Sequence, residues 1–219
     1  IVDGNDNGIV ANSVLAGTSL VRFIATTIPN LNLTGGKITI IDPHAGTSTS
    51  DYAFVVSQSG GSSSATTAHM VQFGNGVSTT AGGATNGFYV YLWQGSNYYS
   101  FGNVNVEALT GTNRFVKTTG TIGILGNLTI ASGEYLLNST TYIAGNLVNN
   151  GTLTATSTLN LATWIGTATA SANPQTISGS GVFRNSLTTT TANLLSLTVN
   201  NTNATGVTLN VPLSVSGTL

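Results

Sequence analysis

A short pattern that recurs at nearly regular spacing limits what this chain can fold into. Ile124-Leu-Gly-Asn-Leu128 returns 19 residues later as Ile143-Ala-Gly-Asn-Leu147, and Val215-Ser-Gly-Thr-Leu219 repeats its form further on. The Gly-Asn pair also occurs at Gly74-Asn75 and at Gly102-Asn103, 28 residues apart. Irregular periods of about 20 residues are typical of solenoids, in which each repeat forms one coil of a stacked core.

The residues between these pairs alternate as β-strands do. From Thr152 to Leu161, small or apolar side chains occupy every second position, and threonine or asparagine fills the others. A period of two turns one set toward a core and the other toward solvent. The same texture recurs in residues 37–41, 103–106, 195–199 and 207–211. No long stretch combines helical apolar spacing with helix-forming residues, so the pattern indicates an all-β chain.

These features predict a parallel β-helix, or β-solenoid, with inward Leu, Ile and Val stacked from coil to coil. At about 20 residues per coil the chain would make about eleven coils, and right-handed coiling is the commoner form. Asparagines at matching turns would form amide ladders. Residues 1–110 predict an irregular, decorated section, and residues 111–219 predict regular coils that continue into a longer parent chain. The alternative is an array of β-sandwiches, which also has many short strands.

Composition excludes several classes of function. Only 5% of the residues are charged and the formal net charge is -1, against about 25% charged residues in an average soluble domain. Such a chain offers no basic surface for nucleic acid. The hydrophobic residues, 40% of the chain, are patterned, which argues against disorder. Cysteine is absent, which excludes disulfides, and no apolar run is long enough to predict membrane insertion.

Several segments resemble the repeat-rich secreted surface proteins of Bacteroidota, which are exported by the type 9 secretion system. The segments that carry the resemblance are Gly35–Pro43, Phe73–Gly87, Gly111–Val116, Pro174–Phe183, Leu197–Asn201, Gly206–Leu209 and Val215–Leu219. Some proteins of that group serve as adhesins in gliding motility or attachment. The resemblance implies an extracellular segment of a cell-surface adhesin, although the sorting domain of the group is not visible in the sequence.

One segment has the beginning of a calcium-loop pattern. In Asp3-Gly-Asn-Asp-Asn-Gly8, the residues Asp3, Asn5 and Asn7 occupy positions that bind calcium in an EF-hand. The glutamate expected at the twelfth position is replaced by Val14. Because the same residue types form tight turns, we expect no cofactor, with calcium at this segment as the alternative.

Candidates for catalysis are sparse. His44 lies near Asp42 and Asp51 in a serine-rich stretch, but no Gly-x-Ser-x-Gly turn accompanies them. Glu107 and Glu134 are 27 residues apart and could share a face of the solenoid, as paired carboxylates do in glycosidases. Two solvated turn residues are the simpler interpretation of this pair. The sequence therefore predicts a protein that is not an enzyme.

Aromatic residues gather in one segment, with seven of them in residues 88–101. Strand alternation within residues 88–93 places two tyrosines and a tryptophan on one face. Flat rings of this kind stack on sugars or anchor a protein partner, although a strand covered on both faces would use them only for packing. The candidate residues for glycan or partner binding are Tyr89, Tyr91, Trp93, Tyr98 and Tyr99.

The sequence as a whole predicts a non-catalytic structural or adhesive segment of a large bacterial surface protein. Its expected partners are surface glycans, other copies of the chain, or the rest of the parent chain. One alternative is a self-assembling extracellular fibre subunit, because open coil ends expose unpaired backbone groups. The other is a carbohydrate-binding module that uses the aromatic residues.

Overall fold

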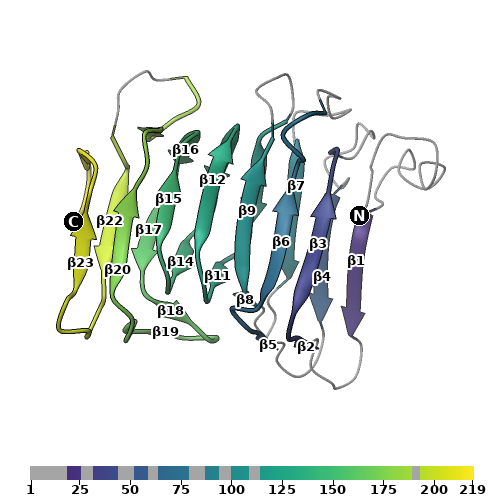
Figure 1. Cartoon of the computed structure of the whole chain (residues 1–219), viewed down its shortest axis with the longest axis horizontal. Helices are drawn as coiled ribbons and strands as arrows, with labels where there is room; N and C mark the ends of the chain where they lie inside the picture. Colours follow the sequence, from purple (N-terminus) through teal and green to yellow (C-terminus); the bar gives the residue numbers. More distant parts are fainter. Residues whose placement is uncertain are drawn as a thin grey trace.

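The chain visits three parallel sheets in turn and then returns to the first, as the computed structural model shows (Figure 1). The structure describes residues 19–25, 32–43, 52–58, 64–78, 87–93, 100–108, 114–188 and 193–219. Among these residues there is no helix with the length and apolar character needed to cross a membrane. The all-β parallel β-helix predicted from the sequence is confirmed.

We number the sheets in the order in which the chain passes through them within each coil from β7 onward. Sheet 1 consists of β1 (Ser19–Ala25), β4 (Tyr52–Gln58), β7 (Phe88–Trp93), β10 (Val116–Thr119), β13 (Glu134–Leu137), β16 (Thr152–Ala155) and β21 (Val182–Arg184). Sheet 2 consists of β8 (Ser100–Phe101), β11 (Ile122–Ile124), β14 (Thr141–Ile143), β17 (Thr158–Leu161) and β22 (Ser196–Val199). Sheet 3 consists of β3 (Gly36–Ile40), β6 (His69–Phe73), β9 (Asn103–Glu107), β12 (Leu128–Ser132), β15 (Leu147–Asn149), β20 (Gln175–Ser178) and β23 (Val207–Leu209).

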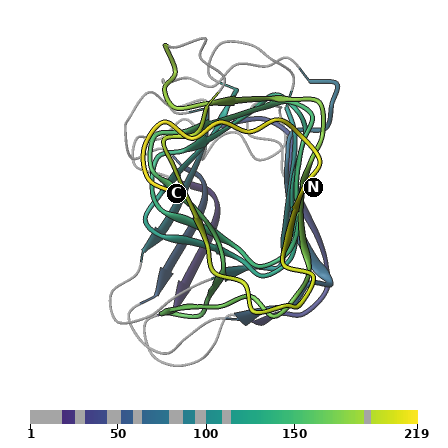
Figure 2. The same ribbon diagram turned by 90° about the vertical axis from the view of Figure 1, so that its left-hand side faces the viewer.

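Two smaller pairs complete the described strands. β2 (Asn32–Leu33) and β5 (Ser64–Ala65) run parallel, and β18 (Thr163–Trp164) and β19 (Ala168–Thr169) form an antiparallel hairpin. In Figure 1 the strands of sheet 3 lie in front and point up, whereas those of sheet 1 lie behind and point down. Seen from the C-terminal end (Figure 2), the chain therefore turns counter-clockwise as it advances toward the viewer, which is a right-handed coil.

The coils differ in length. Residues in register on neighbouring strands of sheet 1 are Ser19 and Tyr52, Phe54 and Val90, Phe88 and Val116, Val116 and Tyr135, Tyr135 and Leu153, and Leu153 and Phe183. These pairs are 33, 36, 28, 19, 18 and 30 residues apart, as their numbers show. The described residues form seven coils rather than the expected eleven, because most coils carry insertions beyond the basic repeat of about 20 residues.

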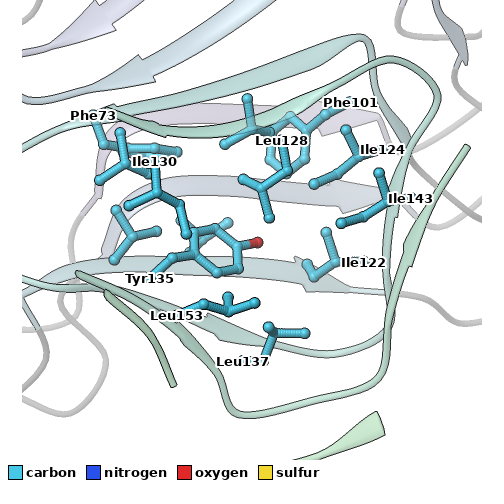
Figure 3. Packing of buried hydrophobic residues seen from close by; sticks show 14 of the residues in the cluster. Phe73, Phe101, Ile122, Ile124, Leu128, Ile130, Tyr135, Leu137, Ile143 and Leu153 are labelled. Atoms are coloured by element: carbon cyan, nitrogen blue, oxygen red, sulfur yellow. The ribbon is translucent and has the colours of Figure 1, made fainter. Parts of the chain in front are cut away.

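The interior is filled by rows of apolar side chains that run from coil to coil. One row of sheet 3 consists of Val71, Val104, Leu128, Leu147, Ile177 and Leu209, each in register with the next. All of these are buried except Leu209 in the last coil, which is 53% exposed. Figure 3 shows the interior, with side chains of all three sheets facing one another. Each fully buried side chain of this size contributes roughly 1.5–3 kcal/mol.

Glycines form the corner between sheets 2 and 3, where the recurring pattern lies. Gly126 N–H donates to the carbonyl of Gly102 at 2.6 Å, and Gly145 N–H donates to the carbonyl of Gly126 at 2.9 Å. A Cβ atom at Gly145 would lie 2.5 Å from the Gly126 carbonyl oxygen. Only glycine allows successive coils to approach so closely, which is why it recurs at this corner.

The asparagine that follows each of these glycines forms a ladder of hydrogen bonds from coil to coil. Asn127 N–H donates to Asn103 Oδ1 and Asn146 N–H donates to Asn127 Oδ1, both at 2.8 Å. Thr176 N–H continues the series to Asn146 Oδ1 at 2.9 Å. Each side chain thus satisfies a backbone donor of the next coil, and the series extends over four coils. The asparagines are aligned as expected, but the bonds join backbone N–H groups to side-chain oxygens and do not form the expected amide-to-amide ladder.

Two members of the recurring pattern prove to belong elsewhere. Gly74-Asn75 follows β6 and lies at the corner between sheets 3 and 1, where Asn75 Oδ1 accepts hydrogen bonds from the backbone of Val77 and Ser78. Val215 bridges to Leu194, which precedes β22, so this segment leads toward sheet 2 instead of leaving it. Similar residue patterns therefore mark tight turns at different corners. Only the Gly-Asn pairs at Gly102, Gly126 and Gly145 occupy equivalent positions in their coils.

Candidate functional site

Three tyrosines lie together on the outer face of sheet 1. Tyr89 and Tyr91 alternate along β7 with three buried residues, which confirms the predicted alternation of that strand. Tyr52 begins the neighbouring strand β4, and its ring centroid lies 4.7 Å from that of Tyr89 and 5.3 Å from that of Tyr91. All three side chains are half-buried, so the rings both pack together and remain open to solvent.

A cation completes this group. Lys117 lies on β10 in register with Tyr89, and its Nζ atom is 4.9 Å from the centroid of the Tyr89 ring. An ammonium over an aromatic face contributes about 0.5–1 kcal/mol at an exposed site. We call Tyr52, Tyr89, Tyr91 and Lys117 the tyrosine–lysine cluster.

The phenol of Tyr52 is neutral. Burial, followed by the proximity of Tyr89 and Tyr91, raises the pKa of Tyr52 above its ordinary value. Its hydroxyl group therefore stays protonated at neutral pH, where it can both donate and accept hydrogen bonds. Among the four side chains of the cluster, Lys117 provides the only charge.

The other residues predicted for this site divide into two groups. The backbone of Trp93 ends β7 in register with Ser57, but its side chain lies outside the described part of the structure. Tyr98, Tyr99 and the candidate calcium ligands Asp3, Asn5 and Asn7 also lie outside the described residues. Tyr89 and Tyr91 are therefore the predicted residues of this site whose side chains the structure describes.

Sequence reasoning missed Tyr52 and Lys117. Each lies in a segment that reads as a strand, but Tyr52 is 37 residues before Tyr89 and Lys117 is 28 residues after it. Insertions of unequal length separate these strands, so their register does not follow from the sequence. A lysine is nonetheless uncommon here, because the chain has only five Lys and Arg residues in total.

A buried ion pair occupies the corner between sheets 3 and 1. Arg114 Nη1 donates to Asp42 Oδ1 at 2.9 Å, and both side chains are almost fully buried, with 1% and 5% exposed. Ser78 Oγ donates to the same carboxylate oxygen, and the guanidinium lies 5.4 Å from the centroid of the Phe88 ring. Asp42 is thus bound by arginine and serine, while its suggested catalytic neighbours His44 and Asp51 lie outside the described residues.

The two glutamates considered as an acid–base pair lie in different sheets. Glu107 ends β9 in sheet 3, where its carboxylate accepts hydrogen bonds from Gln72 Nε2 at 3.0 Å and Asn105 Nδ2 at 2.8 Å. Glu134 begins β13 in sheet 1 and accepts a hydrogen bond from Thr154 Oγ1. Each carboxylate has partners within its own sheet, so the structure assigns them to sheet packing.

Within the described ranges, no group of three or more His, Asp and Glu side chains is placed to hold a metal ion. Comparison of the chain with family models, with curated proteins and with solved structures found no match. The tyrosine–lysine cluster is therefore the candidate site, and its role has to be inferred from its own geometry.

Proposed function

We propose that this chain is a non-catalytic structural and adhesive segment of a large bacterial surface protein that acts outside the cell. The observation that supports this most is the continuity of the scaffold, because sheets 1 and 3 run through all seven coils without interruption. The resemblance to type 9 secretion substrates, including gliding adhesins, agrees with such a role. A rod of this kind holds binding surfaces at a distance from the cell.

Mechanical resistance follows from how the coils are joined. Separating two central coils breaks the hydrogen bonds of three sheets together with the asparagine ladder. A single hydrogen bond contributes only about 0.5–1.5 kcal/mol net, but the bonds of one coil interface must break together. The scaffold therefore suits a protein that bears load.

Adhesion follows from the outer surface of sheet 3. On the outer side of this sheet, the half-buried Thr39, Thr129 and Thr176 and the exposed Thr208 present hydroxyl groups. Such neutral groups make weak contacts that can be repeated many times, and repeated weak contacts add up to strong attachment.

Attachment under flow tests the proposal. Beads that carry the chain at increasing density settle on a layer of cell-surface polysaccharide, and the shear flow is then raised. We expect the number of retained beads to rise more steeply than the density, because the contacts are multivalent. Beads with heat-denatured chain and beads without protein are the controls. Retention no greater than that of the controls contradicts the adhesive role.

A fibre subunit is the second candidate, and the last coil supports it. Val199 and Leu209 continue interior rows whose preceding members, Leu161 and Ile177, are buried, yet they are 51% and 53% exposed. A further coil stacked on this face, from the parent chain or from a second copy, would bury them.

Electron microscopy over a range of concentrations separates the two sources of that coil. Filaments that appear as concentration rises, and that are lost in Leu209→Asp, support the fibre subunit. The matched control is Val77→Asp, because Val77 is 77% exposed but lies at a corner between sheets. Single rods at every concentration contradict the fibre and leave the adhesive segment as the proposed function.

A further inference from the structure

The tyrosine–lysine cluster combines aromatic surface with one of the few positive charges of the chain. Of the five Lys and Arg residues, Arg114 is buried in its ion pair with Asp42. Lys117, in contrast, is half-buried on the outer face of sheet 1 and lies against an aromatic ring. A chain with 5% charged residues thus has a cation among three half-buried rings.

This combination fits one chemical class of ligand. The C–H face of a sugar ring packs against aromatic rings, and phenol hydroxyl groups hydrogen-bond to sugar hydroxyls. A lysine ammonium has three donors and forms its strongest hydrogen bonds with anionic acceptors such as carboxylates. A sugar that carries a carboxylate, a uronic acid, satisfies both parts of the cluster.

We propose that the tyrosine–lysine cluster is a binding site for the uronic-acid residues of acidic polysaccharides. The sugar ring packs on the exposed parts of Tyr52, Tyr89 and Tyr91, and its carboxylate binds the Lys117 ammonium. The inference rests on the proposed adhesive role, to which it adds the class of surface that the chain recognises.

Affinity electrophoresis with polygalacturonate tests the site, and the fully methyl-esterified polymer serves as the comparison because it differs only in lacking the carboxylate charge. We expect the whole chain to be retarded by polygalacturonate and at least about tenfold less by the ester. A tenfold change corresponds to about 1.4 kcal/mol, which lies just below the contribution of a hydrogen bond to a charged group.

Two variants separate specific recognition from general charge attraction. Lys117→Gln should weaken the retardation by about tenfold, whereas Lys37→Gln, which removes an exposed charge from sheet 3, should leave it unchanged. Tyr91→Ala should weaken binding to both polymers, and its circular dichroism spectrum shows whether it folds. Equal effects of the two lysine variants, or equal retardation by the two polymers, would overturn the proposal.

The outcome is independent of the attachment assay. If polygalacturonate does not retard the chain but beads are still retained under flow, the uronate site is wrong and the adhesive role stands. If neither assay gives a signal, both proposals fail.

Discussion

The corner between sheets 3 and 1 is built in two ways in the two halves of the molecule. In the early coils, a buried cluster of Asp42, Ser78 and Arg114 holds it together across long insertions. In later coils, glycines at positions 133, 151 and 181 replace side chains with direct backbone contact. A Cβ atom at Gly151 would lie 2.4 Å from the Gly133 carbonyl oxygen, and one at Gly181 would lie 2.3 Å from that of Gly151.

The two constructions differ in what they require. The early corner depends on three residues that the other coils do not repeat. Asp42 and Ser78 are 36 positions apart, and so are Ser78 and Arg114. The later corner depends on the same residue type in each coil. An ion pair out of water requires both partners, whereas close backbone approach requires only the absence of a side chain. Damage to the early corner should therefore cost more free energy.

The largest expected effect comes from breaking the buried ion pair. Arg114→Met leaves the Asp42 carboxylate buried without its cation, and loss of one partner of such a pair lowers the free energy of unfolding by about 3–5 kcal/mol. Urea unfolding followed by circular dichroism measures the change. The double variant Asp42→Asn with Arg114→Met should regain much of the loss, because no uncompensated charge remains. A single variant as stable as the parent would show that the pair does not hold this corner.

The later corner is broken by adding one methyl group. Gly151→Ala pushes a Cβ atom into the Gly133 carbonyl and should destabilise the protein by about 1–3 kcal/mol, as overpacking generally does. Gly35→Ala is the matched control, because nothing lies within 4 Å of a Cβ atom there. The melting temperatures of the two variants measure the difference in stability. Equal values would mean that the later coils can separate without penalty.

A smaller effect is expected from the asparagine ladder at the other corner. Asn127→Ala removes the acceptor of the Asn146 N–H and should cost about 1 kcal/mol, because Asn127 is exposed and water replaces part of the bond. Asn127→Asp keeps an acceptor oxygen and should lose less. Hydrogen exchange of the Asn146 amide reports the bond directly. Unchanged exchange in the alanine variant would contradict the role given to the ladder.

The smallest effect at neutral pH is expected from a phenol in the interior. Tyr135 lies in register between Val116 and Leu153, is 1% exposed, and lies near Thr118 and Thr141. Tyr135→Phe should change the free energy of unfolding by about 1 kcal/mol or less at pH 7. This residue, like Arg114, occurs once in its row and is not repeated by the coil.

The pH dependence of stability separates Tyr135→Phe from the parent protein more clearly than stability at pH 7 does. Burial raises the pKa of Tyr135, partly offset by the two threonines. Below pH 10 the phenol is neutral in both folded and unfolded chains, but above about pH 10 only the unfolded chain ionises freely. Stability is therefore present below pH 10 and is lost as pH rises, and Tyr135→Phe should reduce this alkaline loss. Identical pH profiles of the two proteins would contradict the assignment.

The parts predicted from the sequence are those that each coil repeats. The alternation in residues 152–161 indicated strands, and the spacing of Gly126 and Gly145 indicated the period and the alignment of the asparagines. Gly133 and Gly151 are 18 residues apart, and this spacing indicates the same period for the corner between sheets 3 and 1. The sequence-based prediction was made without it. The number of coils was wrong because insertions in most coils have no period of their own.

Half of the candidate site was likewise predicted from a local sequence pattern. Tyr89 and Tyr91 share a face because they are two residues apart, which any strand dictates. Tyr52 and Lys117 join them only because loops of unequal length bring β4 and β10 into register on either side of β7. No local pattern encodes that register.

The sequence by itself determined the scaffold of this protein, because apolar, glycine and asparagine residues recur at equivalent positions of successive coils. The tertiary structure alone decided which single residues meet, namely Arg114 with Asp42 and Lys117 with the tyrosines. The physical reason is that a coil repeats backbone hydrogen bonds and packing, whereas charges and isolated rings find partners only after the insertions have been accommodated.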